Sequence, residues 1–508
     1  MTYFLGVDVG SSGCKVTAID GEGAIVSSAS QAYQTSYPKP GWAEQNPQDW
    51  FDSACAAIRC CLREGRIDPK DVLAISLDGP AHNVALLDEN DKVLYPTLHW
   101  SDTRSIRQCE FLKAQYLEKI FKISYHQPNP SWTLSQLLWL KENEPEVWKK
   151  LRKIQVTKDY VRLRFTGDYA TDVYDAIGTQ LFDVEKSAWS EEICELLEFP
   201  TEYLPKVRRA MDVAGKLNGP AAQATGLPAG IPVAIGSGDS VVEAYGVGAL
   251  VPGQCVVKIA TSATVSLVTA AAHPTLQTIT YPHVSGKSWY SIAATNCGAA
   301  TMRWFKDTIG HGIEKQAESE GKNVFSLIDE LARSIPAGCE GLIFHPYLNG
   351  ERTPYWDPLL RGDFVGITSH HSLAHFARAI MEGVAFSLYD CFLVIQEMAP
   401  TVSDICMIGG GTKSPVWSQI LCDTFGLPLS KPAMDDAAYG SAILAGVAAG
   451  YLDGSLGSIR RLVKVEKTFR PDAEIHDVYR QYFEIYRSVT QHLAEANHKI
   501  ALLTRSDA

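Results

Sequence analysis

Residues 6–16 read GVDVGSSGCKV, an apolar run that is interrupted by one acid, Asp8, and by a Gly-Ser-Ser-Gly turn. The chain continues as VTAIDGEGAIVSSAS, two more apolar stretches with a second turn between them. Short apolar stretches between Gly-rich turns predict three strands joined as an antiparallel meander. An acid in the first strand is typical either of a turn-capping residue or of a ligand contact, and this stretch by itself leaves both open.

A second hairpin with the same chemistry lies in the middle of the chain. Residues 255–270 read CVVKIATSATVSLVTA, which is an apolar strand, a tip of small hydroxyl residues and another apolar strand. The preceding segment IPVAIGSGD, residues 231–239, is a strand that runs into a Gly-Ser-Gly-Asp loop. Because one hairpin pattern occurs in both halves, we predict a duplicated domain.

The length of 508 residues also favours two or more domains. We place the boundary near residues 244–252 and expect one domain over 1–246 and a second over 247–508. Residues 125–230, richer in Pro, Trp and Tyr, are expected to form an inserted cap on the first domain. Strands alternate with helical patterns such as 106–120, and this alternation predicts the α/β fold class.

Composition limits the classes of partner. The formal net charge of −12 argues against a nucleic-acid groove or an anionic membrane surface as the main partner. A small anionic ligand stays possible, since backbone N–H groups can hold one against an acidic background. The twelve cysteines form no C-x-x-C pair, and we expect reduced thiols in a cytoplasmic protein. Asp8 interrupts the first apolar run, so neither a signal peptide nor a membrane span is expected.

Two stretches near the C-terminus have apolar residues at helical spacing. Phe376, Ile380, Val384 and Leu388 recur every four residues, and we predict a core helix there. Residues 476–503 are predicted to form a closing helix. We assign no ligand role to either stretch.

Turns rich in glycine and hydroxyl residues follow three of the expected strands. They are Gly10-Ser11-Ser12-Gly13, Ala260-Thr261-Ser262 and Gly409-Gly410-Gly411-Thr412. Such turns let backbone N–H groups approach phosphate oxygens, and the hydroxyl groups add donors. One such turn is weak evidence, but three in one chain favour a bound nucleotide.

The common nucleotide motifs are absent from the sequence. Gly286-Lys287-Ser288 resembles the end of a P-loop, but Tyr281 stands where that motif requires glycine, and no G-x-G-x-x-G occurs. Two hairpins and a triple glycine around a nucleotide instead indicate the architecture shared by actin, Hsp70 and sugar kinases.

Two acids are candidates for chemistry within this architecture. Asp8 lies on a strand next to a phosphate-binding turn, where a carboxylate can hold Mg²⁺ directly or through water. Asp239 ends the IGSGD loop, where a carboxylate can accept a hydroxyl proton during phosphoryl transfer. Each is equally typical of a turn or of a helix N-cap when it is considered alone.

Several motifs identify the chain as similar to the FGGY carbohydrate kinases over its full length. SWTLSQLLWLKEN, residues 131–143, nearly matches one family signature, and GDFVGITSHHSLAHFARAIME, residues 362–382, matches the other in spacing and residue type. Within the family, YLNGERTP at 347–354, WSDTR at 100–104 and KDYVRLRFTGDYATD at 158–172 resemble the xylulokinase group.

The resemblance implies an ATP-dependent kinase with two actin-like, ribonuclease H-like domains and a cleft for sugar and nucleotide between them. It implies Asp239 as the catalytic base and Asp8 at the Mg²⁺ site. It assigns cofactor binding to Gly10, Ser11, Ser12, Lys15, Thr261, Ser262, Gly298, Gly409, Gly410, Gly411 and Thr412. It assigns sugar contacts to Ala81, His82, Trp100, Asp102, Asp239 and Ser240. The structural alternatives are a core aromatic for Trp100 and a structural histidine for His82.

The sequence departs from the xylulokinase pattern on the sugar side. The Gly-Gln-Met-His loop of that group is here Gly79-Pro80-Ala81-His82, and the Asn after the catalytic Asp is Ser240. The departures on the nucleotide side, such as Ala260 for glycine, are mild. Replacing a polar sugar contact by a smaller apolar one changes substrate preference by roughly 1 to 3 kcal/mol. The fold and the reaction type are therefore better supported than the sugar.

The expected function is phosphorylation of D-xylulose to D-xylulose 5-phosphate by MgATP. The alternatives are a kinase for another ketose or polyol, such as ribulose, erythritol or glycerol, and a sugar-binding regulator without activity. The partner is a small sugar, and the resemblance also allows a homodimer. Glu351 and Arg352 are expected to form a structural ion pair that braces the cleft, with direct substrate contact as the alternative.

Overall fold

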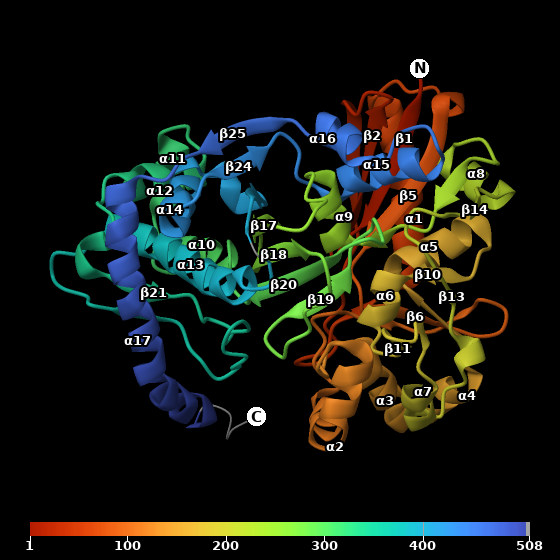
Figure 1. Cartoon of the computed structure of the whole chain (residues 1–508), viewed down its shortest axis with the longest axis horizontal. Helices are drawn as coiled ribbons and strands as arrows, with labels where there is room; N and C mark the ends of the chain where they lie inside the picture. The colour runs from red at the N-terminus through yellow and green to blue at the C-terminus, as the bar shows by residue number, and fades with distance from the viewer. Residues whose placement is uncertain (400, 504–508) are drawn as a thin grey trace.

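Two seven-stranded sheets form the two halves of the protein (Figure 1). The structure is a computed structural model, and it describes residues 1–399 and 401–503. The first sheet runs β14 (Val213–Lys216), β15 (Pro232–Ala234), β5 (Val72–Gly79), β1 (Tyr3–Val9), β2 (Gly13–Asp20) and β3 (Ile25–Ala32), with β16 (Ser237–Gly238) paired to β5. The second runs β19 (Ile279–Pro282), β20 (Trp289–Thr295), β18 (Ala263–Thr269), β17 (Gln254–Ile259), β23 (Asp404–Ile408), β24 (Leu429–Pro432) and β25 (Val465–Phe469).

The two sheets repeat one topology. β1 pairs antiparallel with β2 and parallel with β5, and β17 pairs antiparallel with β18 and parallel with β23. The hairpin turns at 10–12 and 260–262 therefore occupy corresponding places, each at the end of a central strand. This repeat confirms the duplicated α/β architecture and the antiparallel meander that the sequence predicts.

Helix α1 (Pro47–Glu64) covers one face of the first sheet. It begins where Asn46 accepts a hydrogen bond from the backbone N–H of Gln48, with Pro47 in its first turn. Its apolar face buries Trp50 and Ile58 in the same cluster as the β1 side chains. Burying such side chains stabilises the contact by roughly 1.5 to 3 kcal/mol each. Helices α5 (Thr157–Thr166) and α8 (Gly219–Thr225) pack on this face with α1.

A separate layer of elements lies below the first sheet in the view of Figure 1. It holds the three-stranded sheet β7 (Val93–Tyr95), β6 (Val84–Leu87) and β9 (Lys153–Val156), and α2 (Ile106–Ser124), α3 (Thr133–Asn143), α4 (Pro145–Lys150) and α7 (Glu191–Leu197). These elements share their own apolar cluster. The layer thus begins before residue 125, and α5 and α8, from within the expected 125–230 cap, pack on the main sheet instead.

Helix α13 (Leu373–Gln396) is the central helix of the second half. It is long and apolar enough to cross a membrane, but 78% of its most apolar window is buried inside the protein. The predicted core helix is therefore confirmed. Around it pack α10 (Ala300–Asp307), α12 (Val324–Arg333), α14 (Pro415–Phe425) and the predicted C-terminal helix, α17 (Ala473–Leu503). Two further helices of this half are α11 (Ile313–Ser319) and α16 (Leu456–Leu462).

Helix α15 (Ala437–Ala448) joins the two halves, because it stands between β24 and β25 of the second sheet in the chain but packs on the first sheet. Figure 1 shows it in blue beside the red and orange strands β1, β2 and β5. Glycines permit this approach. A Cβ on Gly6 would lie 1.9 Å from the carbonyl oxygen of Ala438, and one on Gly440 would lie 2.1 Å from that of Val242 on α9 (Asp239–Gly246). The backbones are therefore in direct contact, with no room for side chains.

We expect Gly6→Ala to destabilise the protein by about 1 to 3 kcal/mol, because the new methyl group would displace α15 from β1. The measurement is the melting temperature by calorimetry. Gly21→Ala is the matched control, since a Cβ at Gly21 meets nothing within 4 Å. Equal melting temperatures for the two variants would contradict the close contact.

Candidate functional site

A cavity of about 270 Å³ lies where the two halves meet. Asp8 from β1 and Asp239 from the start of α9 both line it, although the sequence singles them out separately. Its lining residues are Asp8, Asp239, Glu243, Lys258, Gly409, Gly410, Lys413, Asp435, Asp436 and Ala437. The cavity thus combines two candidate catalytic carboxylates with the triple-glycine turn.

The triple-glycine turn leaves β23 and is held against β17. Gly409 has a φ of +90° and a position where a Cβ would meet the carbonyl oxygen of Ile259 at 2.7 Å, so only glycine fits. Its N–H donates to Asp435 at 2.8 Å. The hydroxyl of Thr412 donates to the carbonyl oxygen of Gly409 at 2.8 Å and is buried. Thr412 and the buried Gly411 therefore shape the turn, while Gly409 and Gly410 line the cavity.

The turn between β17 and β18 is packed against Gly298. A Cβ at Gly298 would lie 2.7 Å from the carbonyl oxygens of Ala260 and Ser262, and its N–H donates to that of Thr261 at 3.0 Å. Arg303 donates to the Thr261 hydroxyl at 2.9 Å. Gly298 was expected among the cofactor-binding residues, and this backbone contact explains why the position holds a glycine.

The turn between β1 and β2 carries Gly10, Ser11 and Ser12. The indole N–H of Trp100 donates to the Ser11 hydroxyl at 2.8 Å, and Trp100 is 45% exposed. Trp100 is therefore not a core aromatic. It links the loop that was expected at the sugar to the turn that was expected at the phosphates.

Lys15 was expected at the nucleotide and forms an ion pair across the two halves. Its Nζ lies 2.8 Å from Oδ2 of Asp436, the residue that caps α15. Asp436 also lines the cavity. The pair therefore connects β2 of the first half to the cavity wall contributed by the second.

A second carboxylate that the sequence analysis missed lies beside Asp8. Asp78, the penultimate residue of β5, lies opposite Asp8 in the parallel register and is fully buried. The Ser441 hydroxyl on α15 donates to Asp78 at 2.5 Å. Burial and the Asp239 charge raise the pKa of Asp8 to about 7, and burial and the Asp8 charge raise the pKa of Asp78 well above its ordinary range. The sequence feature that could have identified Asp78 is an acid at the end of the apolar stretch VLAISLD, residues 72–78.

Asp239 is the first residue of α9 and is half-buried. Its Oδ1 accepts hydrogen bonds from the N–H of Ser240 at 2.6 Å and from the Ser240 hydroxyl at 3.1 Å. Among the described residues, Oδ2 accepts no hydrogen bond. The N-cap of α9 is Gly238 rather than Asp239, so the carboxylate does not serve as a helix cap.

His82 lies in an aromatic cluster to which both halves contribute. It has a φ of +78°, and its ring stacks on Trp132 with centroids 4.2 Å apart. Its Nδ1 donates to the carbonyl oxygen of Gly178 at 2.6 Å, so Nε2 accepts from the hydroxyl of Tyr281, 3.4 Å away on β19. Burial lowers the pKa of His82 to about 4, which keeps the ring neutral.

The same aromatic cluster extends to the loop that carries Asp239. Tyr174, on α6 (Val173–Gly178), stacks on Tyr281 with centroids 3.9 Å apart. A Cβ on Gly238 would lie 2.1 Å from the Tyr174 ring. His82 and Asp239 are therefore connected through Tyr281 and Tyr174, neither of which the sequence analysis assigned to the site. Ala81 is buried next to His82.

The expectation for Asp102 is corrected by its contacts. Asp102 is 0% exposed, and the Arg104 guanidinium donates to its Oδ1 at 3.0 Å and to its Oδ2 at 2.7 Å. Oδ2 also accepts from the N–H of Ala43 at 2.6 Å. Because both oxygens are occupied by protein donors, Asp102 braces its loop and is not a sugar ligand.

The expected ion pair between Glu351 and Arg352 is also corrected. Glu351 accepts from the Thr295 hydroxyl at 2.6 Å and from the N–H groups of Asn296 and Arg352 at 2.9 and 2.7 Å. The Arg352 guanidinium donates to the Thr295 carbonyl oxygen at 3.1 Å. No ion pair joins the two side chains within the described residues. The pair braces the end of β20 by hydrogen bonds instead.

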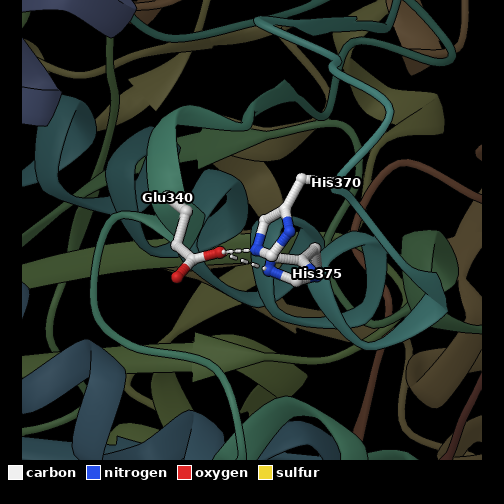
Figure 2. Close-up of side chains that lie close together, drawn as sticks. All are labelled: Glu340, His370 and His375. Atoms are coloured by element: carbon white, nitrogen blue, oxygen red, sulfur yellow. Dashed lines mark hydrogen bonds and ion pairs between the residues drawn. The ribbon is translucent and has the colours of Figure 1, made fainter.

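Figure 2 shows a further polar group, Glu340, His370 and His375, in the second half. Nε2 of His370 and Nε2 of His375 lie 2.6 and 3.1 Å from one carboxylate oxygen of Glu340. Nδ1 of His375 accepts from the backbone N–H of Ser372, so the neutral ring carries its proton on Nε2 and donates it to Glu340. A metal ion at Nε2 of His375 would need the lone pair of that nitrogen, where the proton is instead bound. We therefore interpret the group as a hydrogen-bonded clamp on the start of α13.

Comparison with known proteins gives consistent matches. The FGGY family of carbohydrate kinases matches with its N-terminal domain over residues 3–246 and its C-terminal domain over 255–449. The xylulose kinase of Lactococcus lactis is 30% identical, over 98% of this chain and 99% of its own. Crystal structures of xylulose kinase and gluconate kinase from Lactobacillus acidophilus each superpose with a TM-score of 0.90 at 26% identity, over 98% of this chain and 100% and 99% of theirs.

We expect Asp8→Asn to raise the melting temperature at pH 8 and to raise it less at pH 5. Asp8 has a pKa of about 7 in the folded protein and an ordinary value of 3.8. Between these values the folded state holds a proton that the unfolded state lacks, so this group lowers stability as pH rises. Asparagine does not ionise, so the substitution removes this loss of stability at high pH.

Melting temperatures measured without divalent ions across this pH range would check the effect. Asp477→Asn, at an exposed position of α17, controls for the loss of one negative charge. An equal change at pH 5 and pH 8 for Asp8→Asn would refute the raised pKa.

Proposed function

This chain belongs to the FGGY family of carbohydrate kinases, and we propose that the sugar it phosphorylates with ATP is D-xylulose, which it converts to D-xylulose 5-phosphate. The observation that carries the proposal is the single cavity that Asp8, Asp239 and the Gly409-Gly410 turn share. The similarity to xylulose kinases over nearly the whole chain supports the choice of sugar.

Asp239 is the proposed general base. Its Oδ2, without a protein partner among the described residues, accepts the proton of the sugar hydroxyl as that oxygen attacks the γ-phosphorus. The bond between the γ-phosphorus and the oxygen bridging to the β-phosphorus breaks, and ADP leaves. Ser240 holds Oδ1 and thereby orients the carboxylate.

The nucleotide is proposed to lie between the three turns. The donors available to phosphate oxygens are the backbone N–H groups of Gly10, Gly409 and Gly410 and the hydroxyl groups of the turns at 10–13 and 260–262. The remaining proposed members are Ser11, Ser12, Lys15, Thr261 and Ser262. The two halves thus contribute equally to the proposed nucleotide contacts, and the proposed sugar contacts come mainly from residues 1–246.

Asp8 and Asp78 fit a magnesium ion. Both are carboxylates at the cavity end of adjacent strands, and their proximity disfavours two negative charges unless a cation is present. Asp8 lines the cavity and is the proposed ligand, with Asp78 beside it. When bound, Mg²⁺ neutralises charge on the phosphate oxygens.

The sugar pocket is proposed to comprise His82, Trp132, Tyr174 and Tyr281. A neutral His82 offers one acceptor nitrogen, and the stacked rings exclude water from the reacting hydroxyl. The buried Ala81 in place of a longer side chain leaves room for a different sugar. The gluconate kinase among the similar structures makes D-gluconate a second candidate substrate.

The expected cytoplasmic location and homodimer remain part of this proposal. The negative net charge of −12 and the burial of α13 support a globular enzyme that meets its sugar in solution.

ADP release from MgATP should be measured with D-xylulose, D-ribulose, erythritol, glycerol and D-gluconate. We expect D-xylulose to give the highest kcat/KM. Asp239→Asn should retain sugar binding and lose turnover by roughly 10³-fold, because the amide cannot accept the proton.

Each outcome has a distinct meaning. Turnover of another sugar alone would reassign the substrate and leave the kinase in place. Binding of D-xylulose without turnover of any sugar would favour the regulator. Turnover of Asp239→Asn near the wild-type rate would remove Asp239 from the base role.

A further inference from the structure

The cavity carries more negative charge than a site for an anionic nucleotide can tolerate without compensation. Five carboxylates line it, and the positive side chains among the lining residues are Lys258 and Lys413. ATP adds further negative charge at the γ-phosphate, where charge is spread over the transferred group during transfer. A positive side chain next to the reacting atoms therefore supplies compensating charge beside any metal ion.

Lys258 lines the same cavity as Asp8 and Asp239 and interacts electrostatically with both. It is the penultimate residue of β17, and the hairpin tip 260–262 follows directly. Its neighbours Val257 and Ile259 point into the core of the second half, so alternation along the strand places Lys258 on the opposite face, where it lines the cavity with Asp8 and Asp239. The side chain is 32% exposed and so is open to a ligand.

Glu243 holds the ammonium group in place. Its Oε2 lies 2.6 Å from Nζ of Lys258, and it stands one helical turn after Asp239 on α9. This partner keeps Lys258 beside Asp239 without a direct ion pair between them, which would weaken Asp239 as a base. Burial by itself lowers the pKa of Lys258, but the carboxylates of Glu243, Asp239 and Asp8 raise it overall. The side chain therefore stays charged.

We propose that Lys258 is a further catalytic residue, whose ammonium group donates hydrogen bonds to the transferred phosphoryl group, and that Glu243 is its positioning residue. The inference rests on the proposed phosphoryl transfer. The sugar oxygen forms its bond to phosphorus, the bond to the ADP oxygen breaks, and the sugar proton goes to Asp239. Lys258 keeps all its protons and stabilises the charge on the equatorial oxygens.

The alternative is a purely structural clip between α9 and β17, and a set of variants separates the two roles. Lys258→Met removes the charge, and Lys258→Arg retains it. The double variant Lys258→Met/Glu243→Leu removes the pair without leaving a buried carboxylate unpaired. Lys431→Met is the matched control, because Lys431 forms a 3.0 Å ion pair with Glu466 between β24 and β25, outside the cavity.

Single-turnover rates with MgATP and the best sugar, sugar affinity, and melting temperature should be measured for each variant. We expect Lys258→Met to slow phosphoryl transfer roughly 100-fold or more with sugar affinity unchanged. The double variant should recover melting temperature but not rate, Lys258→Arg should recover part of the rate, and Lys431→Met should match the wild type. Glu243→Gln should slow transfer less than Lys258→Met does.

Some results would contradict the role of Lys258, and one would instead contradict the proposed function on which it rests. A rate for folded Lys258→Met within about threefold of the wild type, or rate recovery in the double variant, would overturn it. If the wild type phosphorylates none of the sugars, the proposed function fails instead. MgATP hydrolysis, in which water replaces the sugar hydroxyl, would then still test Lys258 through the same variants, and an unchanged hydrolysis rate would overturn its role.

Discussion

The contact between α15 and β1 is the constraint on which both the fold and the site depend. Gly6 brings the backbone of β1 against α15, and Gly440 brings α15 against the backbone of α9, so α15, a helix of the second half, is fixed on the first. The same helix delivers Ser441 to Asp78 and begins at Asp436, which pairs with Lys15. Rigid placement of one helix therefore sets the distance between the two halves at the cavity.

Electrostatic strain characterises the cavity that results. Asp8, Asp78 and Asp239 lie close enough for burial and mutual repulsion to raise the pKa values of the first two. Such an arrangement destabilises the protein without ligands and favours cations and donors that arrive with the substrate. Lys258, held by Glu243, supplies a fixed part of that positive charge. The excess negative charge in the cavity thus lowers the stability of the folded protein without ligands, and the same charge favours binding of cations there.

The proposed sugar site follows a different physical principle, because it is built from neutral rings. His82 stacks on Trp132, and Tyr174 stacks on Tyr281, which comes from the second half. A change in the separation of the halves would therefore alter the sugar pocket and the phosphate cavity together. This coupling accounts for a site in which water exclusion and phosphate alignment depend on the same interface.

The sequence by itself determined the repeated hairpins and the three glycine-rich turns, and it singled out Asp8 and Asp239 as candidates, because local periodicity and turn chemistry depend on neighbouring residues. It also indicated the family. Only the tertiary structure decided that Asp78 stands beside Asp8, that Glu243 holds Lys258, and that Tyr281 reaches His82. It also showed that Asp102 and Thr412 serve their own loops. These contacts join segments that are distant in the chain, and their distances are set by sheet register and by the position of α15, which no local pattern encodes.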